Sequence, residues 1–277
     1  MYVDSHHHVW SLKRGDYGWL SERSGPVLYR DYMPADLSPL LAAHDIDRTV
    51  LVQAAPTIAE TEFLLGLARR NPFIGGVVGW VDFEAGDAPQ TIARLARDGK
   101  LRGLRPMLQD LEDDAWILRR EIEPAISAMA DSGLCLDLLV FPRHLPHVEK
   151  FLSRHPELRC VIDHGAKPAI ARDEIGPWAT QMGRIARGSA AFCKLSGLVT
   201  EAGPGWSLAA LRPYVDVLLD AFGPERLMWG SDWPVLNLAA GYGDWFAAAR
   251  ALTAGVDPPG RDMIFGGTAK LFYRIRN

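Results

Sequence analysis

The sequence predicts a single (β/α)8 barrel. Eight short apolar runs recur along the 277 residues, each followed by a longer stretch with helical periodicity. The runs are largely apolar without strict alternation, as expected for parallel strands that are covered by helices outside and packed against each other inside. No linker rich in Pro, Gly and Ser divides the chain. Eight strand–helix units therefore favour one barrel domain over residues 1–277 rather than a two-domain doubly wound protein.

The apolar runs define the predicted strands. In chain order they are YVDS near residue 3, TVLVQAA from Thr49, FIGGVVGWV from Phe73, LRGLRPML from Leu101, CLDLLVF from Cys135, RCVID from Arg159, AFCKLS from Ala191 and RLMWGS from Arg226. The three cysteines all fall in these runs, far apart and odd in number, so we expect neither a disulfide framework nor a Cys-x-x-Cys metal site.

Helices are predicted between the strands from spacing and end signals. Thr57 and Glu60 fit a capping box that opens a helix after the second strand. After the seventh strand, apolar residues recur at helical spacing from Leu208 to Phe222, and Gly223-Pro224 supplies a stop. This is the clearest helical pattern in the chain.

Two segments do not fit the regular repeat. Residues 11–40, which follow the first strand, are polar and aromatic and do not look like a barrel helix throughout. We expect them to form a loop region over the end of the first strand, on the side where an α/β barrel has its active site. Residues 267–275 are predicted to form a short closing helix at the end of the chain.

Composition and charge indicate the class of protein. A content of 48% hydrophobic and 23% charged residues is typical of a soluble globular chain. The formal charge of −4 includes no long run of one sign, so neither nucleic acid nor an anionic membrane is an expected partner. The N-terminus lacks a signal-peptide pattern, and no apolar run approaches the roughly 20 residues that span a bilayer. We therefore expect a cytoplasmic protein with a small-molecule partner, and no sequence pattern indicates a particular oligomer.

Polar residues interrupt nearly every apolar run at its carboxyl end, where an α/β barrel places its functional groups. The first run ends in three histidines, and in a strand His6 and His8 point to the same side while His7 points to the other. Two imidazoles about 6 to 7 Å apart along the chain, joined by another nitrogen or a carboxylate, would form a shell for one catalytic Zn²⁺ or Mn²⁺ ion.

Two later strand ends complete this candidate site. The sixth run ends in Asp-His-Gly with His164, and the eighth ends in Ser-Asp-Trp-Pro with Asp232. Alone, His164 could be a hydrogen-bonded structural histidine and Asp232 a helix cap. Together with His6 and His8 at one barrel mouth they predict a catalytic site, in which His6, His8 and Asp232 are the candidate metal ligands.

Four segments carry a family resemblance. The D-x-H-x-H-x-W start at Asp4, DHGAKP from Asp163, KLSGLV from Lys194 and WGSDWPV from Trp229 together resemble the amidohydrolase superfamily, in particular its sugar-lactonase branch of the L-fucono-lactonase type. The similarity covers essentially the whole chain. It implies a barrel enzyme that hydrolyses an aldono-1,5- or 1,4-lactone to the aldonic acid. Arg105 stands where metal-rich members have a bridging lysine or glutamate, which argues against a binuclear centre and leaves one divalent ion or none.

The side chains themselves allow a mechanism for such a reaction. A lactone is an activated ester, so one water, one base and one oxyanion stabiliser suffice. We assign Asp232 as the general base for a water held near His6 and His8, directly or through a bound ion. Arg105, His164 or the bound ion would polarise the ring carbonyl and stabilise the oxyanion.

Substrate contacts are predicted at the same mouth. Trp80 and Trp233 offer flat aromatic faces to a sugar ring, while Gln53, Gln109 and Lys194 offer partners for hydroxyl groups. A lactone that carries carboxylate groups would be expected to meet several arginines at the barrel mouth. The predicted site contains one arginine, Arg105, so we prefer a neutral sugar lactone as the substrate. Two alternatives stay open. One is metal-dependent amide hydrolysis or non-oxidative decarboxylation on the same scaffold, and the other is a non-catalytic sugar-binding barrel.

Overall fold

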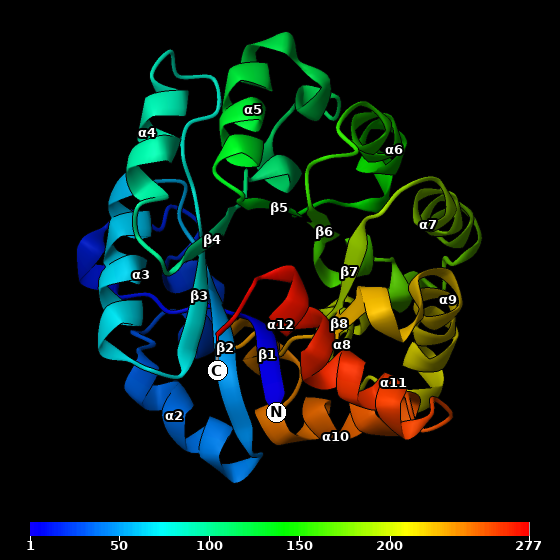
Figure 1. The fold of residues 1–277 in the computed structure, drawn as a ribbon. Coiled ribbons are helices and arrows are strands. Elements are labelled where there is room, and N and C mark those ends of the chain that lie inside the picture. The colour runs from blue at the N-terminus through cyan, green and yellow to red at the C-terminus, as the bar shows by residue number, and fades with distance from the viewer. Residues whose placement is uncertain (277) are drawn as a thin grey trace.

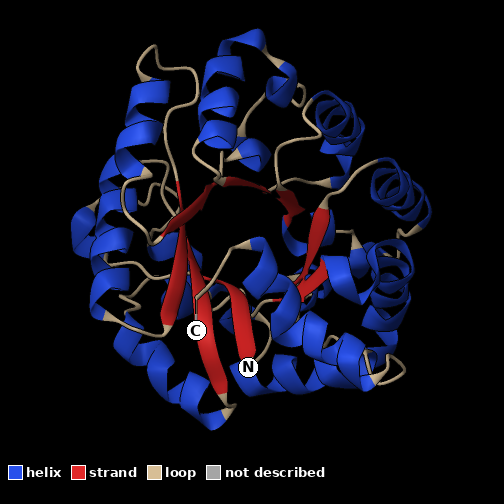
Figure 2. Ribbon diagram, in the orientation of Figure 1, coloured by secondary structure: helices blue, strands red, loops and turns tan. Residues whose placement is uncertain are grey.

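The computed structural model describes residues 1–276 and contains one parallel sheet in which each strand pairs with the next along the chain. The strands are β1 (Tyr2–His7), β2 (Ile46–Val52), β3 (Ile74–Gly79), β4 (Leu101–Leu104), β5 (Cys135–Leu138), β6 (Cys160–Ile162), β7 (Phe192–Leu195) and β8 (Leu227–Trp229). Figure 2 shows these strands as an inner ring with the helices outside it. The three cysteines are buried in β5, β6 and β7 with free thiols, as expected. The predicted (β/α)8 barrel is confirmed.

The helices follow the strands around the barrel (Figure 1). They are α1 (Gly25–Leu28), α2 (Pro34–Ala43), α3 (Ile58–Arg70), α4 (Ala88–Leu95), α5 (Glu123–Asp131), α6 (Leu145–Arg154), α7 (Gly176–Gly188), α8 (Leu198–Ala202), α9 (Leu208–Arg226), α10 (Tyr242–Leu252), α11 (Pro258–Asp262) and α12 (Thr268–Phe272). The Thr57 side chain caps α3 by accepting a hydrogen bond from the Glu60 N–H group, which is one half of the predicted capping box. The reciprocal half is absent, because the Glu60 carboxylate accepts from the backbone N–H groups before Thr57 instead. In α9 the predicted stop is a kink, because Gly223 has a left-handed φ of 64° and one further turn reaches Arg226.

The barrel closes between β1 and β8 through short contacts that we call the β1–β8 seam. The His8 N–H group donates to the Trp233 carbonyl at 2.7 Å, and the Asp232 N–H group donates to the His6 carbonyl at 2.8 Å. Asp4 adds a side-chain link, because its carboxylate accepts a hydrogen bond from the backbone N–H group of Ser231. The seam therefore fixes the carboxyl ends of the first and last strands against each other.

The C-terminal segment closes the opposite end of the barrel, where Figure 1 shows α12 close to β1. Phe272, Tyr273 and Ile275 are buried in one cluster with the valines of the strands that face the barrel interior. A Cβ atom on Gly75 would lie 2.6 Å from Cγ2 of Ile275, so this close packing requires glycine. The closing helix predicted for this segment is present as α12.

Residues 11–40 form short helical turns and the start of α2. Trp10 and Tyr32 exchange both backbone hydrogen bonds at 2.9 Å, which closes the segment on itself. The indole N–H of Trp19 donates to the Ala54 carbonyl at 2.7 Å. Because Ala54 lies in the loop after β2, this contact ties the segment to the carboxyl end of the barrel.

A buried carboxylate supports the same loop. Glu60 accepts hydrogen bonds from the backbone N–H groups of Ala54 and Ala55, the shortest at 2.7 Å. Burial raises the pKa of Glu60 to about 7. The folded state therefore favours the protonated side chain more than the unfolded state does.

Glu60→Gln is expected to make stability less sensitive to pH. The stability that the protonated group contributes is present below its ordinary pKa of 4.5 and is lost as the pH rises through about 7. Between pH 5 and 8 the wild type should lose on the order of 3 kcal/mol that the variant retains. Urea unfolding at both pH values measures the difference, with the exposed Glu225→Gln as the matched control. Equal pH dependence in wild type and Glu60→Gln would contradict this role.

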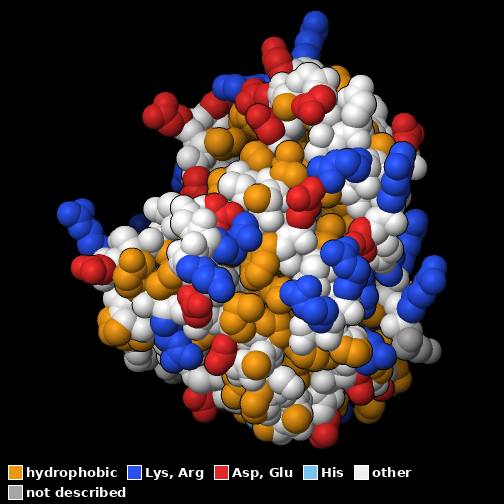
Figure 3. Space-filling view, turned by 90° about the vertical axis from the view of Figure 1, so that its left-hand side faces the viewer, with side chains coloured by type: hydrophobic (Ala, Val, Ile, Leu, Met, Phe, Trp, Pro, Cys, Tyr) orange, Lys and Arg blue, Asp and Glu red, His pale blue; other side chains and the backbone are white. Residues whose placement is uncertain are grey.

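The outer surface carries charges of both signs. Figure 3 faces the α3 and α4 side of the barrel, where lysines and arginines lie interspersed with aspartates, glutamates and apolar side chains. Within residues 1–276, no helix combines the length and the apolar character needed to cross a membrane.

Candidate active site

A cavity of about 230 Å³ lies at the carboxyl ends of the strands. Polar side chains from four strand ends and their loops line it, namely His8, Arg105, Gln109, His164, Lys167 and Asp232. The structure thus brings β1, β4, β6 and β8 to one site, as the strand-end pattern predicts. Ala54 and Trp19 also line this cavity, so the segment 11–40 reaches it.

Three side chains from both sides of the β1–β8 seam converge in this site. The Nε2 atoms of His6 and His8 lie 3.2 Å apart. Oδ1 of Asp232 lies 3.4 Å from Nε2 of His8 and 3.7 Å from Nε2 of His6. Nε2 of His164 is 3.8 Å from the same carboxylate oxygen. One carboxylate oxygen is therefore surrounded by three imidazoles.

The spacing of these donor atoms fits one metal ion. Nδ1 of His8 lies 2.8 Å from the Val52 carbonyl, so Nδ1 carries the proton and Nε2 presents a lone pair. Tetrahedral zinc with bonds of about 2.0–2.1 Å separates its ligand atoms by about 3.4 Å. The separations among His6, His8 and Asp232 are 3.2, 3.4 and 3.7 Å, which matches that geometry. His6, His8 and Asp232 could therefore hold a single divalent ion.

His164 is held in place by a tight local backbone. It has a left-handed φ of 54°, and its Nδ1 atom lies 2.8 Å from the Ser196 hydroxyl. A Cβ atom on Gly197 would lie 2.8 Å from the ring, so only glycine permits this approach. Burial lowers the pKa of His164 to about 4, and the imidazole is neutral at pH 7. A neutral ring can donate from one nitrogen while accepting at the other.

Asp232 also has a left-handed backbone, with φ of 59°. Burial acts to raise the pKa of this carboxyl, but the neighbouring imidazoles of His164 and His8 outweigh it and lower the pKa. The side chain is therefore ionised at neutral pH. Non-glycine residues in this backbone region are strained, and such strain concentrates at functional positions.

A buried charge network lies behind His6. The Lys194 ammonium contacts Oδ2 of Asp137 at 2.6 Å, Oδ1 of Asp163 at 2.9 Å and Nδ1 of His6 at 3.0 Å. The Tyr273 hydroxyl donates to the same Asp137 oxygen at 2.7 Å. Burial opposes the charge on Lys194, but Asp137 and Asp163 outweigh it and raise the pKa of the ammonium. This network fixes the position of the His6 ring.

Arg105 connects the cavity to this network. Its Nη1 atom lies 3.2 Å from Oδ2 of Asp163 and 3.4 Å from Nε2 of His6. Its other terminal nitrogen donates to the Gln53 carbonyl. The guanidinium thus presents a fixed positive charge to the cavity.

The five predicted substrate-binding residues separate into two groups. Gln109 lines the cavity, where its side-chain oxygen accepts a hydrogen bond from Lys167, and Trp80 lines an adjoining cavity. Gln53, Lys194 and Trp233 are buried and line neither of these two cavities. Their positions have a physical reason: Gln53 donates to the Arg105 carbonyl, Lys194 neutralises two carboxylates, and Trp233 packs edge-on against an aromatic ring.

Sequence reasoning did not assign roles to Asp137, Asp163 and Tyr273. A charged residue inside an apolar strand was the available signal for Asp137, which interrupts CLDLL as Lys194 interrupts FCKLS. Opposite charges facing one barrel interior would pair. The contact of Tyr273 with Asp137 joins residues 136 positions apart and has no local signal.

Comparisons with known proteins agree with the resemblance drawn from the motifs. A family model described as amidohydrolase matches residues 3–275. The chain is 48% identical to an L-fucono-1,5-lactonase of Burkholderia ambifaria, covering 99% of this chain and 95% of that protein. It is 39% identical to an L-fucono-1,5-lactonase of Burkholderia multivorans, covering 99% and 96%. A crystal structure of a Burkholderia multivorans amidohydrolase with bound zinc superimposes with a TM-score of 0.94 at 37% identity, covering 100% of both chains. The match over nearly its full length places the chain in the amidohydrolase family.

Proposed function

We propose that this protein hydrolyses a neutral aldono-1,5-lactone of the L-fucono-lactone type to the open aldonic acid. The carboxylate of Asp232, surrounded by three imidazoles in a cavity of about 230 Å³, is the observation that carries the proposal. Similarity to two L-fucono-1,5-lactonases over nearly the whole chain supports the substrate class. The proposed setting is the cytoplasm, with a small sugar lactone as partner.

Asp232 acts as the general base. Its ionised carboxylate takes a proton from a water molecule held beside His6 and His8, and the water oxygen bonds to the lactone carbonyl carbon. The tetrahedral intermediate then collapses, and the bond between that carbon and the ring oxygen breaks. Asp232 returns the proton to the ring oxygen, which becomes a hydroxyl group. The product is the aldonic acid, and water is the only co-reactant.

Arg105 and His164 stabilise the charge that develops on the carbonyl oxygen. Arg105 offers a guanidinium N–H, and neutral His164 offers Nε2–H in the tautomer in which Nδ1 accepts from the Ser196 hydroxyl. Both groups line the cavity and are held by buried partners, so they need little reorganisation during the reaction.

His6, His8 and Asp232 are the proposed ligands of one divalent ion. Such an ion, when bound, would lower the pKa of its water and polarise the lactone carbonyl. The arrangement of Lys194 behind His6 keeps that ring oriented toward the shared point among the three donor atoms.

Substrate hydroxyl groups contact Gln109, and the segment 11–40 covers the ring through Trp19. Gln53, Lys194 and Trp233 act one layer further back, by holding Arg105, His6 and the loop after β8.

A substrate panel tests the proposed function. Aldonolactones of the L-fucose, L-galactose and L-rhamnose types should release acid, followed with a pH indicator and corrected for spontaneous hydrolysis. Amides and hydroxybenzoates, followed by ultraviolet absorbance, should not turn over. Release of carbon dioxide from a hydroxybenzoate with no lactone turnover would reject the proposal in favour of decarboxylation.

His8→Asn is expected to weaken metal binding. Removing an imidazole ligand should lower Zn²⁺ affinity at least about 100-fold, since loss of groups that merely orient ligands already costs 10- to 100-fold. Titration calorimetry on metal-free protein should give one site in the wild type. His147→Asn is the control, because His147 lies on α6 away from the cavity. Unchanged Zn²⁺ affinity in His8→Asn would remove His8 from the ligand set.

A further inference from the structure

A second cavity adjoins the proposed active site. It has a volume of about 660 Å³, compared with about 230 Å³ for the first. Trp19, Met107 and Asp110 line both cavities, so they form a shared boundary. The reaction assigned to the smaller cavity does not use the larger one. A lactone bound in the first cavity therefore lies next to the second cavity, with these three residues at the boundary.

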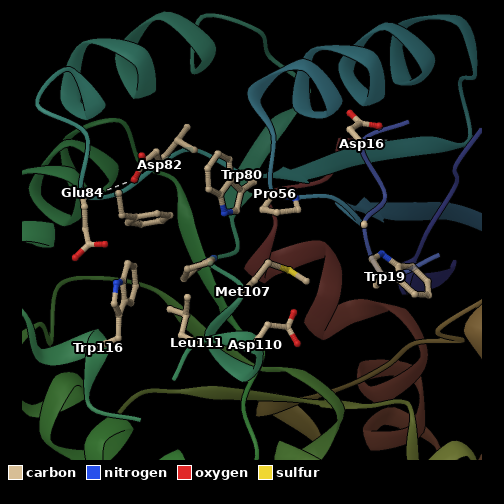
Figure 4. A pocket seen from close by; sticks show the side chains of 14 residues that line it. Asp16, Trp19, Pro56, Trp80, Asp82, Glu84, Met107, Asp110, Leu111 and Trp116 are labelled. Atoms are coloured by element: carbon tan, nitrogen blue, oxygen red, sulfur yellow. Dashed lines mark hydrogen bonds between the residues drawn. The ribbon is translucent and has the colours of Figure 1, made fainter. Parts of the chain in front are cut away.

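The second cavity has aromatic walls from separate parts of the chain. Trp80 follows β3, Trp116 lies between β4 and α5, and Trp19 comes from the segment 11–40. Figure 4 shows Trp80 and Trp116 on opposite sides of the space above Leu111, with Met107 between them and Trp19. No hydrogen bond within residues 1–276 engages the Trp80 indole N–H, which leaves this donor for a ligand.

The charged groups of this cavity are all acidic. Asp16, Asp82, Glu84 and Asp110 line it, and none of the described lining residues is lysine or arginine. Arg14 neutralises Asp16 and Arg119 neutralises Glu84. The Asp110 carboxylate at the shared boundary has no hydrogen bond or ion pair with the described part of the chain. This charge pattern disfavours an anionic group and provides acceptors for hydroxyl groups.

We propose that the second cavity binds a neutral sugar ring attached to the lactone, so that the enzyme opens the 1,5-lactones of oxidised disaccharides as well as single-ring lactones. The lactone ring occupies the smaller cavity beside Asp232, and the glycosidic bond passes between Trp19 and Asp110. The second ring lies against Trp80 and Trp116, whose faces cover its apolar surface. Asp110 and Asp82 accept hydrogen bonds from its hydroxyl groups. This inference rests on the proposed lactonase function and specifies its substrate class.

The experiment compares kcat/KM for a single-ring aldono-1,5-lactone with kcat/KM for disaccharide 1,5-lactones of several linkages. Two variants test the cavity from opposite directions. Trp116→Ala removes one aromatic wall, and Leu111→Trp fills the space. In both variants, the ratio of kcat/KM for the disaccharide lactone to kcat/KM for the single-ring lactone should fall about 10-fold. This is the loss expected when one aromatic contact and the area it covers are removed. The ratio does not depend on how much of each variant is folded.

Trp206→Ala is the matched control, because this tryptophan is partly buried near α8 and lines neither cavity. It should leave the ratio within about 2-fold of wild type, well below the change expected for the cavity variants. Turnover of the single-ring lactone without turnover of any disaccharide lactone would overturn this inference alone. An unchanged ratio in both cavity variants would also overturn it. Failure on every lactone would overturn the proposed function and this inference together.

Discussion

Asp232→Asn is expected to lower kcat for lactone hydrolysis at least about 100-fold. The amide keeps the size of the carboxylate but cannot take a proton from water, and it is a poorer metal ligand. The fold should survive, because asparagine tolerates the left-handed backbone that Asp232 adopts, and the N–H donated to His6 belongs to the main chain. The substitution therefore removes the proton acceptor, while the backbone hydrogen bonds of the β1–β8 seam remain.

Steady-state kinetics on the best lactone, together with circular dichroism and thermal unfolding, would check this result. Asp220→Asn on the exposed face of α9 is the matched control and should retain full activity. Turnover of Asp232→Asn within a few-fold of wild type would refute the general-base role. A variant that fails to fold would instead lack the thermal unfolding transition, and its kinetics would then not test the general-base role.

Lys194→Met is expected to destabilise the protein by about 3–5 kcal/mol. Methionine fills similar volume, but it leaves Asp137 and Asp163 without the ammonium that lies 2.6 and 2.9 Å from their oxygens. Both carboxylates are fully buried, so water cannot replace the lost partner. Activity should fall as well, because Nδ1 of His6 loses a neighbour that fixes its ring.

Urea unfolding measures the loss, and Lys150→Met on the exposed face of α6 should change stability by no more than about 0.5 kcal/mol. Adding Asp137→Asn to Lys194→Met removes one unpaired charge and should recover part of the lost stability. A change below about 1 kcal/mol in Lys194→Met would show that the network contributes little to folding.

Most of the fold could be predicted because its signals are local. Each apolar run needs only its own residues to indicate a buried strand, and Thr57 with Glu60 marks the start of α3 within one turn. The site was accessible for the same reason: parallel strands place their carboxyl ends together, so His6, His8, His164 and Asp232 could be grouped without knowing any side-chain contact.

The roles of individual side chains behind the cavity could not be predicted in this way. Gln53 and Trp80 both follow strands, yet Gln53 turns into the core to hold Arg105, while Trp80 faces a cavity. Side-chain direction beyond a strand end depends on the loop backbone and on distant partners. Tyr273 illustrates the limit, since its hydroxyl meets Asp137 only after the C-terminal segment has packed into the barrel.

The β1–β8 seam has a consequence for how activity arises during folding. His6 and His8 belong to the first strand, and Asp232 follows the last one, so base and imidazoles come together only when the two ends of the chain meet. Contacts between residues so distant in sequence form late, because a long loop must close first. Recovery of lactone turnover after dilution from denaturant therefore reports the joining of the two chain ends, whereas recovery of helical circular dichroism reports the earlier growth of the strand–helix units between them.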